Sequence, residues 1–98
     1  MDVMTHVTIR GRVQGVGFRA WAEVTALQRG LQGWVRNRRD GSVEVLFAGP
    51  EDAVGAMVAA CRHGPRGSGV NGLDQRAGTA AEFALRRPGD RFSMLPTA

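Results

Sequence analysis

Hydrophobic and polar residues alternate along the first part of the chain. Val7, Ile9, Gly11 and Val13 fall on one side of the alternation, and the polar residues His6, Thr8, Arg10 and Arg12 fall on the other. A period of two residues is typical of a half-buried strand. We therefore predict a strand from Val7 to Val13, with its polar side, His6 included, facing solvent.

A glycine-rich loop and a helical pattern follow this strand. The segment Gln14–Phe18 holds two glycines and is a poor strand or helix interior. Beyond it, apolar residues recur at helical spacing at Ala20, Val24, Leu27 and Leu31. The spacing predicts a helix over Arg19–Arg29, ended by Gly30.

The middle of the chain has the pattern of a hairpin and a second helix. Leu31–Asn37 and Val43–Phe47 flank an Asp-Gly pair, which favours a tight turn between two strands. Pro50 suits a first helical position, and His63-Gly64-Pro65 suits a helix end. The apolar face of this second helix consists of Val54, Met57, Val58 and Cys61.

The last third of the chain has a weaker pattern. We expect a strand at Val70–Gln75, a short strand at Glu82–Arg86 and a terminal piece at Arg91–Leu95. The order is strand, helix, strand, strand, helix, strand. This order predicts a single α+β domain over residues 1–98, a ferredoxin-like βαββαβ sandwich with an open antiparallel sheet of four to five strands and both helices on one face.

Length and composition narrow the class of protein. A chain of 98 residues forms about one domain. The single cysteine, Cys61, excludes an internal disulfide and an all-cysteine metal site. No apolar run is long enough to span a bilayer, and the first residues lack the pattern of a secretory signal. We expect a cytoplasmic monomer that makes no use of a membrane.

The charge of the chain is concentrated near its beginning. All thirteen basic residues are arginines, and residues 10–39 hold seven of them against one acid, Glu23. A cluster of positive charge attracts phosphate or nucleic acid. A solvated basic surface explains the same composition, so charge alone leaves both interpretations open.

The predicted topology brings two polar groups to one edge of the sheet. A helix that crosses from one strand to the next joins parallel strands, so the first two strands run in the same direction with the third between them. Their carboxyl ends then meet at one edge. Arg19 follows the first of these ends and Asn37 lies at the second.

The glycine-rich loop has the chemistry of an anion site. Gly15 and Gly17 leave backbone N–H groups open to a ligand, and the following helix adds the partial positive charge of its first turn. The guanidinium of Arg19 can donate two parallel hydrogen bonds to one phosphate.

Other phosphate motifs fit less well. Gly15-x-Gly17-x-x-Ala20 matches the dinucleotide fingerprint formally, but that motif needs a larger, doubly wound sheet. A nucleotide P-loop needs a lysine, and the chain has none. Single-strand RNA modules stack bases on sheet aromatics, whereas Phe and Trp total six here, tyrosine is absent and Trp34 is better explained by packing.

Two segments carry a resemblance to a known family. Residues 11–19 read Gly-Arg-Val-Gln-Gly-Val-Gly-Phe-Arg, and residues 33–44 read Gly-Trp-Val-Arg-Asn-Arg-Arg-Asp-Gly-Ser-Val-Glu. Both resemble the signature segments of the acylphosphatases, in the right separation, and the resemblance extends over residues 5 to 65. The end of the chain and Arg29 in the first helix depart from the family pattern.

The resemblance implies a small enzyme that hydrolyses the carboxyl-phosphate bond of small acyl phosphates, with neither metal nor cofactor. It implies that Arg19 holds the phosphate and that Asn37 positions the attacking water. The phosphate-binding residues it implies are Gln14, Gly15, Val16, Gly17, Phe18 and Arg19. No specific nucleic-acid partner is expected. The alternative is a binding module of the same shape, either a domain of carbamoyl-transfer proteins or an RNA binder that uses the basic face.

Overall fold

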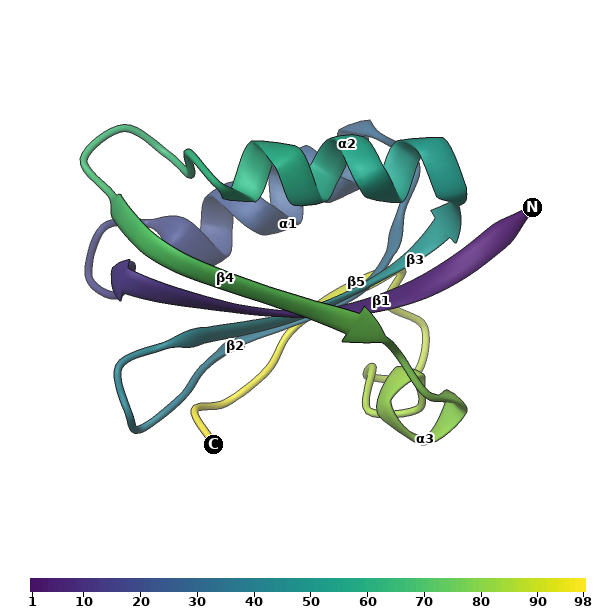
Figure 1. Ribbon diagram of the computed structural model, residues 1–98. Coiled ribbons are helices and arrows are strands. Elements are labelled where there is room, and N and C mark those ends of the chain that lie inside the picture. The colour runs from purple at the N-terminus through teal and green to yellow at the C-terminus, as the bar shows by residue number, and fades with distance from the viewer.

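The computed structural model describes residues 1–98 and contains five strands and three helices (Figure 1). In chain order the elements are β1 (Asp2–Arg12), α1 (Phe18–Gln28), β2 (Gln32–Asn37), β3 (Val43–Pro50), α2 (Glu51–Cys61), β4 (Gly69–Ala77), α3 (Ala80–Phe83) and β5 (Phe92–Met94). The longest helices have 11 residues, and none of the three is long and apolar enough to cross a membrane.

The strands form one sheet in the order β4-β1-β3-β2-β5. β3 pairs antiparallel with both β1 and β2, so β1 and β2 run in the same direction, as the crossover predicted. The predicted ferredoxin-like sheet is confirmed, and it is antiparallel except at one edge, where β5 pairs parallel with β2. After β4 the chain crosses to the opposite edge of the sheet and enters β5 in the direction of β2 (Figure 1).

The main core lies between the sheet and the pair α1 and α2, which cover one face (Figure 1). The predicted apolar face of α2 is confirmed, since all four of its residues are buried. The predicted apolar face of α1 is wrong at Val24 and Leu27, which are 53% and 42% exposed, whereas Leu31, just beyond the helix, is buried as that pattern predicts. The buried residues of α1 are Phe18, Ala22 and Ala26. Alanines let this helix pack close to the sheet, and they give a weak signal in a hydrophobic pattern.

The predicted strand at Glu82–Arg86 is also wrong, because α3 begins just before it. Thr79 caps this helix by accepting a hydrogen bond from the backbone N–H of Glu82, whose carboxylate accepts one from the backbone N–H of Thr79. This reciprocal capping box favours a helix start over a strand. The segment lies on the sheet face opposite α1 and α2 (Figure 1).

A second, smaller core forms beneath α3. Trp34, Leu46 and Leu95 are buried there, with Phe83 packed against them. The indole N–H of Trp34 donates to the backbone oxygen of Glu82 at 2.7 Å. Trp34 therefore packs against the protein, as predicted, and its ring is closed to a nucleic-acid base.

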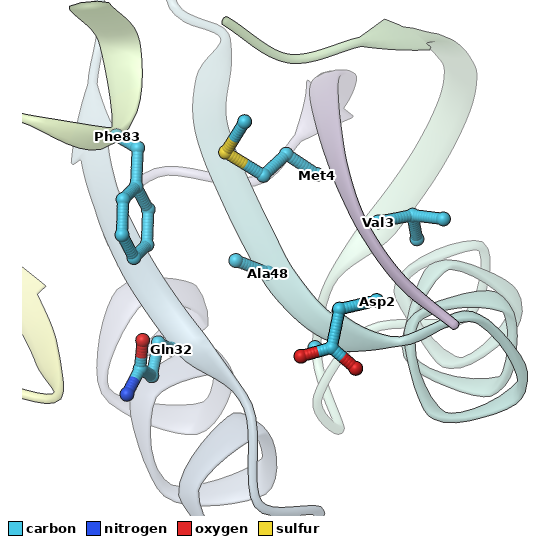
Figure 2. A pocket seen from close by; sticks show the side chains of 7 residues that line it. Asp2, Val3, Met4, Gln32, Ala48 and Phe83 are labelled. Atoms are coloured by element: carbon cyan, nitrogen blue, oxygen red, sulfur yellow. The ribbon is translucent and has the colours of Figure 1, made fainter. Parts of the chain in front are cut away.

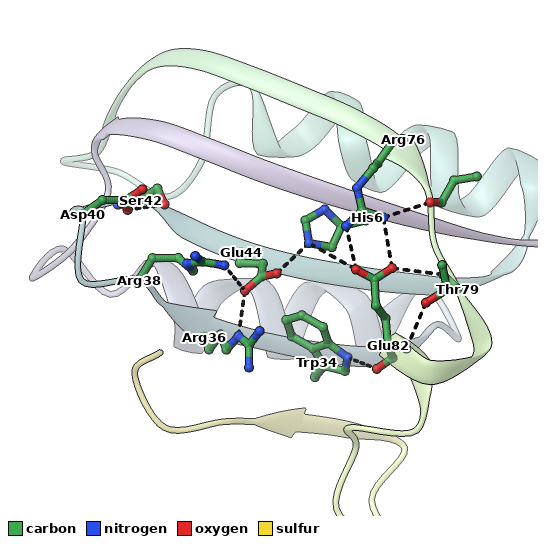
Figure 3. Close-up of polar contacts among 11 residues, drawn as sticks. His6, Trp34, Arg36, Arg38, Asp40, Ser42, Glu44, Arg76, Thr79 and Glu82 are labelled. Carbon is green, nitrogen blue, oxygen red and sulfur yellow. Dashed lines mark hydrogen bonds and ion pairs between the residues drawn. The ribbon is translucent and has the colours of Figure 1, made fainter.

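The cover given by α3 also corrects the expected exposure of His6. The His6 side chain is buried, and its Nε2 lies 2.7 Å from Oε2 of Glu44 and 3.9 Å from Oε2 of Glu82 (Figure 3). Glu44 also accepts hydrogen bonds from Arg36 at 2.6 Å and Arg38 at 3.2 Å. Burial alone would raise the pKa of Glu44, but hydrogen bonds from Arg36 and His6 outweigh it and place the pKa below its usual value.

Glu82 makes the fold sensitive to acid. Hydrogen bonds from Arg76 lower its pKa to about 2, assisted by the backbone N–H of Thr79 and opposed by burial. A carboxylate whose pKa is lower in the folded state stabilises the protein above its unfolded pKa, and this contribution is lost as pH falls toward the folded pKa. We expect the melting temperature to fall between about pH 5 and pH 2.

Glu82→Gln should flatten this decline in melting temperature, measured by thermal denaturation at a series of pH values. Glu23→Gln removes a carboxylate that forms no ion pair, and it should follow the parent curve. Equal acid sensitivity in the parent and the Glu82 variant would show that the Arg76 pair contributes nothing to folding stability.

Candidate active site

The loop between β1 and α1 has a backbone shape that two glycines allow. Gly15 and Gly17 have φ angles of 73° and 79°, in the left-handed region that side chains with a Cβ rarely adopt. Gly17 is the N-cap of α1 and offers no side-chain cap, and the first turn contains no acid. The first hydrogen bond of the helix runs from the backbone N–H of Trp21 to the oxygen of Gly17. The backbone N–H groups of the residues before Trp21 therefore have no acceptor within the helix. Such a helix start attracts an anion.

Phe18 fixes the position of this helix start. The residue is 1% exposed, and its ring packs edge-on against Trp21 at 5.3 Å between ring centroids. Gly64 lies against the same ring with a φ of 67°, and a Cβ there would meet the Phe18 ring at 2.7 Å. A buried aromatic at the first helical residue therefore sets the direction in which Arg19, the next residue, leaves the helix.

A cavity of about 150 Å³ lies between this loop and the end of β2. Arg19 and Asn37 both line it, although they come from different elements. Arg19 is its only charged side chain, and this arginine forms no ion pair or hydrogen bond elsewhere in the protein. The full lining is Val13, Gln14, Gly15, Gly17, Phe18, Arg19, Ala20, Asn37 and Met94. The cavity thus presents one positive charge and no negative charge.

Asn37 closes the other side of the cavity at the last residue of β2. Its backbone oxygen accepts a hydrogen bond from Ala98 N at 3.0 Å, which holds the strand end in place. Its side-chain Oδ1 is buried and has no hydrogen-bond partner. Because an unpaired buried acceptor costs free energy, this oxygen favours a ligand that donates a hydrogen bond to it.

The predicted phosphate-binding residues differ in where their side chains lie. Val16 does not line the cavity, because its side chain packs partly against the core. The Nε2 group of Gln14 donates to two backbone oxygens, those of Arg38 and Ser42. Met94 was missing from the predicted site, because the weak pattern near the end of the chain did not place β5 beside β2.

The structure offers neither a metal-binding cluster nor a reactive thiol. No three His, Cys, Asp or Glu side chains come together to form a metal site. Cys61 is buried, and burial raises the pKa of its thiol to about 12, so it stays protonated and is a poor nucleophile.

A larger cavity, of about 330 Å³, lies beside the N-terminal end of β1 and below Phe83 (Figure 2). Its side chains include Met4 and Ala48, with Asp2 and Gln32 as the polar ones, and none is basic. A cavity with an acid and no cation does not suit an anionic ligand.

Fold and cavity together define a small ferredoxin-like protein with an arginine and an amide facing one cavity the size of a small anion. The chain belongs to the acylphosphatase family, whose family model matches residues 5–92. It is accordingly a hydrolase that acts on the acid anhydride bond of acyl phosphates.

Individual relatives agree with this assignment. The chain is 60% identical over 92 residues to an acylphosphatase from Bradyrhizobium diazoefficiens, covering 94% of this chain and 93% of that protein. The crystal structure of acylphosphatase from Bacillus subtilis is similar at a TM-score of 0.81 and 38% identity, covering 97% of this chain and 99% of that one.

Some structural neighbours are much longer than this chain. Full-length HypF, in a phosphate- and nucleotide-bound form, is similar at a TM-score of 0.83, but the match covers 99% of this chain and 12% of that one. The identity is 22%, so this similarity shows the shared fold alone.

Proposed function

We propose that the protein hydrolyses small acyl phosphates without a metal, with Arg19 and the loop of residues 14–18 binding the phosphate and Asn37 positioning the attacking water. The observation that carries this proposal is the convergence of Arg19 and Asn37 on one cavity beside the uncapped start of α1. These are the groups that phosphoryl transfer by positioning and charge stabilisation requires.

The phosphate binds between a cation and a set of amides. The guanidinium of Arg19 supplies two parallel donors to two phosphate oxygens. The backbone N–H groups at the start of α1 add further donors and the positive end of the helix dipole. These groups neutralise the charge on the phosphoryl oxygens as the transition state forms.

The attacking water is held by Asn37. The water donates a hydrogen bond to Oδ1, the buried oxygen that has no protein partner, and keeps a lone pair directed at phosphorus. The bond from water oxygen to phosphorus forms as the bond from phosphorus to the carboxyl oxygen breaks. The carboxylate leaves with the bonding electron pair. One proton of the water stays on the oxygen that now belongs to phosphate, and the other passes to a phosphoryl oxygen of the same product. An amide is too weak a base to take this proton, and the good leaving group makes a strong base unnecessary.

Independence from metal ions is directly testable. Phosphate release from acetyl phosphate or benzoyl phosphate should continue at the parent rate in excess chelator, because the cavity holds no acid, histidine or cysteine able to bind a metal. The control is the same assay with each divalent ion added back. Loss of turnover in chelator, restored by one particular ion, would refute this mechanism.

The location of the protein, its oligomeric state and its lack of a specific nucleic-acid partner remain predictions. A cytoplasmic monomer without a specific nucleic-acid partner fits a small-molecule hydrolase. The binding-module alternative finds less support, because Trp34 is buried and a relative of matching length is named as an acylphosphatase. Absence of phosphate release from both test substrates would favour the binding module.

A further inference from the structure

Gln14 links two parts of the active site through its side-chain amide. Its Nε2 lies 2.7 Å from the backbone oxygen of Arg38 and 2.9 Å from that of Ser42. A primary amide has two N–H donors, and two carbonyl oxygens accept them here. The side chain is therefore fully occupied as a donor within the protein.

The two acceptors belong to the first and last residues of the turn between β2 and β3. Arg38 N donates to the Ser42 oxygen at 2.8 Å, and Gly41 N donates to the Arg38 oxygen at 3.1 Å. Asp40 Oδ1 accepts hydrogen bonds from the backbone and the hydroxyl of Ser42 at 2.9 Å and 2.6 Å. This turn is well tied, and it begins at the residue after Asn37.

Strand pairing alone does not join the two halves of the site. The loop that carries Arg19 follows β1, whereas Asn37 ends β2, and β3 lies between these strands. No ladder hydrogen bond therefore runs directly from one half to the other. Gln14 provides that direct connection, from the loop to the turn that follows Asn37.

We propose that Gln14 is a positioning residue, whose amide holds the phosphate-binding loop in line with the water held by Asn37. The proposal rests on the proposed function above. With both N–H groups occupied, the side chain has only Oε1 left to present to a phosphate, and that oxygen would repel it. Any contact of Gln14 with phosphate is thus left to its backbone N–H. In-line attack needs close alignment of water and phosphorus, and a shift of about 1 Å can cost a hundredfold in rate.

The test is a double-mutant cycle with Gln14→Met, which keeps the length of the side chain and removes both donors. We expect kcat for benzoyl phosphate to fall about tenfold to a hundredfold. Competitive inhibition by inorganic phosphate should change less than about twofold, because Arg19 and the helix start remain. Gln75→Met is the matched control, since Gln75 is exposed on β4 and makes no side-chain hydrogen bond, and it should keep the parent kcat.

The cycle combines Gln14→Met with Asn37→Ala. If Gln14 acts by aligning the water, its loss should cost little more once Asn37 is gone, so the two falls in kcat should not multiply. If the double variant's decrease in kcat equals the product of the two single decreases, the positioning role is overturned and the proposed function stands. The same conclusion follows if phosphate inhibition weakens as much as kcat falls. An unchanged kcat in Asn37→Ala alone would overturn both. Should Gln14→Met fail to fold, Gln14→Asn serves the same cycle, because its amide is one methylene too short to reach both oxygens.

Discussion

Replacing Arg19 by lysine should reduce kcat/KM by at least about a hundredfold, although the positive charge is kept. The guanidinium presents two parallel N–H groups to two phosphate oxygens, and a single ammonium cannot reproduce that planar fork. Arg19 is also the only charged side chain in the cavity, so nothing nearby can take over its contacts. Inorganic phosphate should inhibit the parent competitively and the lysine variant far less.

The control for this variant is Arg29→Lys, at the other end of α1, where the side chain is exposed and lies outside the cavity. It should keep the parent kinetics in the same phosphate-release assay. Near-parental activity of Arg19→Lys would mean that Arg19 acts through its charge alone.

Asn37→Ala should separate the chemical step from phosphate binding. Removing one positioned polar group at such a site lowers the rate by about a hundredfold to a thousandfold, or about 3 to 4 kcal/mol of barrier. Inhibition by phosphate should persist nearly unchanged, because Arg19 and the amides of α1 still hold the phosphate. Steady-state kinetics with and without added phosphate measures both quantities.

Folding stability provides a second readout for this variant. The Asn37 side-chain oxygen has no partner in the folded protein, so its removal breaks no hydrogen bond of that oxygen and should not lower the melting temperature. Asn71→Ala, on the exposed edge strand β4, is the control and should retain full activity. Weaker phosphate binding with kcat preserved, or outright unfolding, would assign Asn37 a binding or structural role in place of water positioning.

Much of this site was predictable because its local signals agree with its topology. The alternation around Val7 and Ile9, the two loop glycines and the Asp40-Gly41 turn each match the element in which they lie. The parallel direction of β1 and β2 follows from the helix between them, and this was enough to place Arg19 opposite Asn37. The local residue pattern, together with the rule that a crossover helix joins parallel strands, was therefore enough to predict where the cavity lies.

The parts that were mispredicted depend on contacts between distant segments. His6 belongs to the polar side of its strand, and only the cover supplied by α3 buries it against Glu44. The capping box at Thr79 and Glu82 was a readable signal for that helix. The hydrogen-bond partners of Gln14 could not be predicted from the sequence, because they are backbone oxygens, which every residue has whatever its side chain.

The strand order has a consequence for how the protein folds. β1 pairs with β3 and β4, which come much later in the chain, and β5 closes the far edge beside β2 and brings Met94 into the cavity. Chains whose contacts join distant residues fold slowly, because loop-closure entropy is lost before the contacts form. We expect a chain still emerging from the ribosome to hold the arginine and the asparagine without a finished cavity, which becomes complete only when the last strand docks.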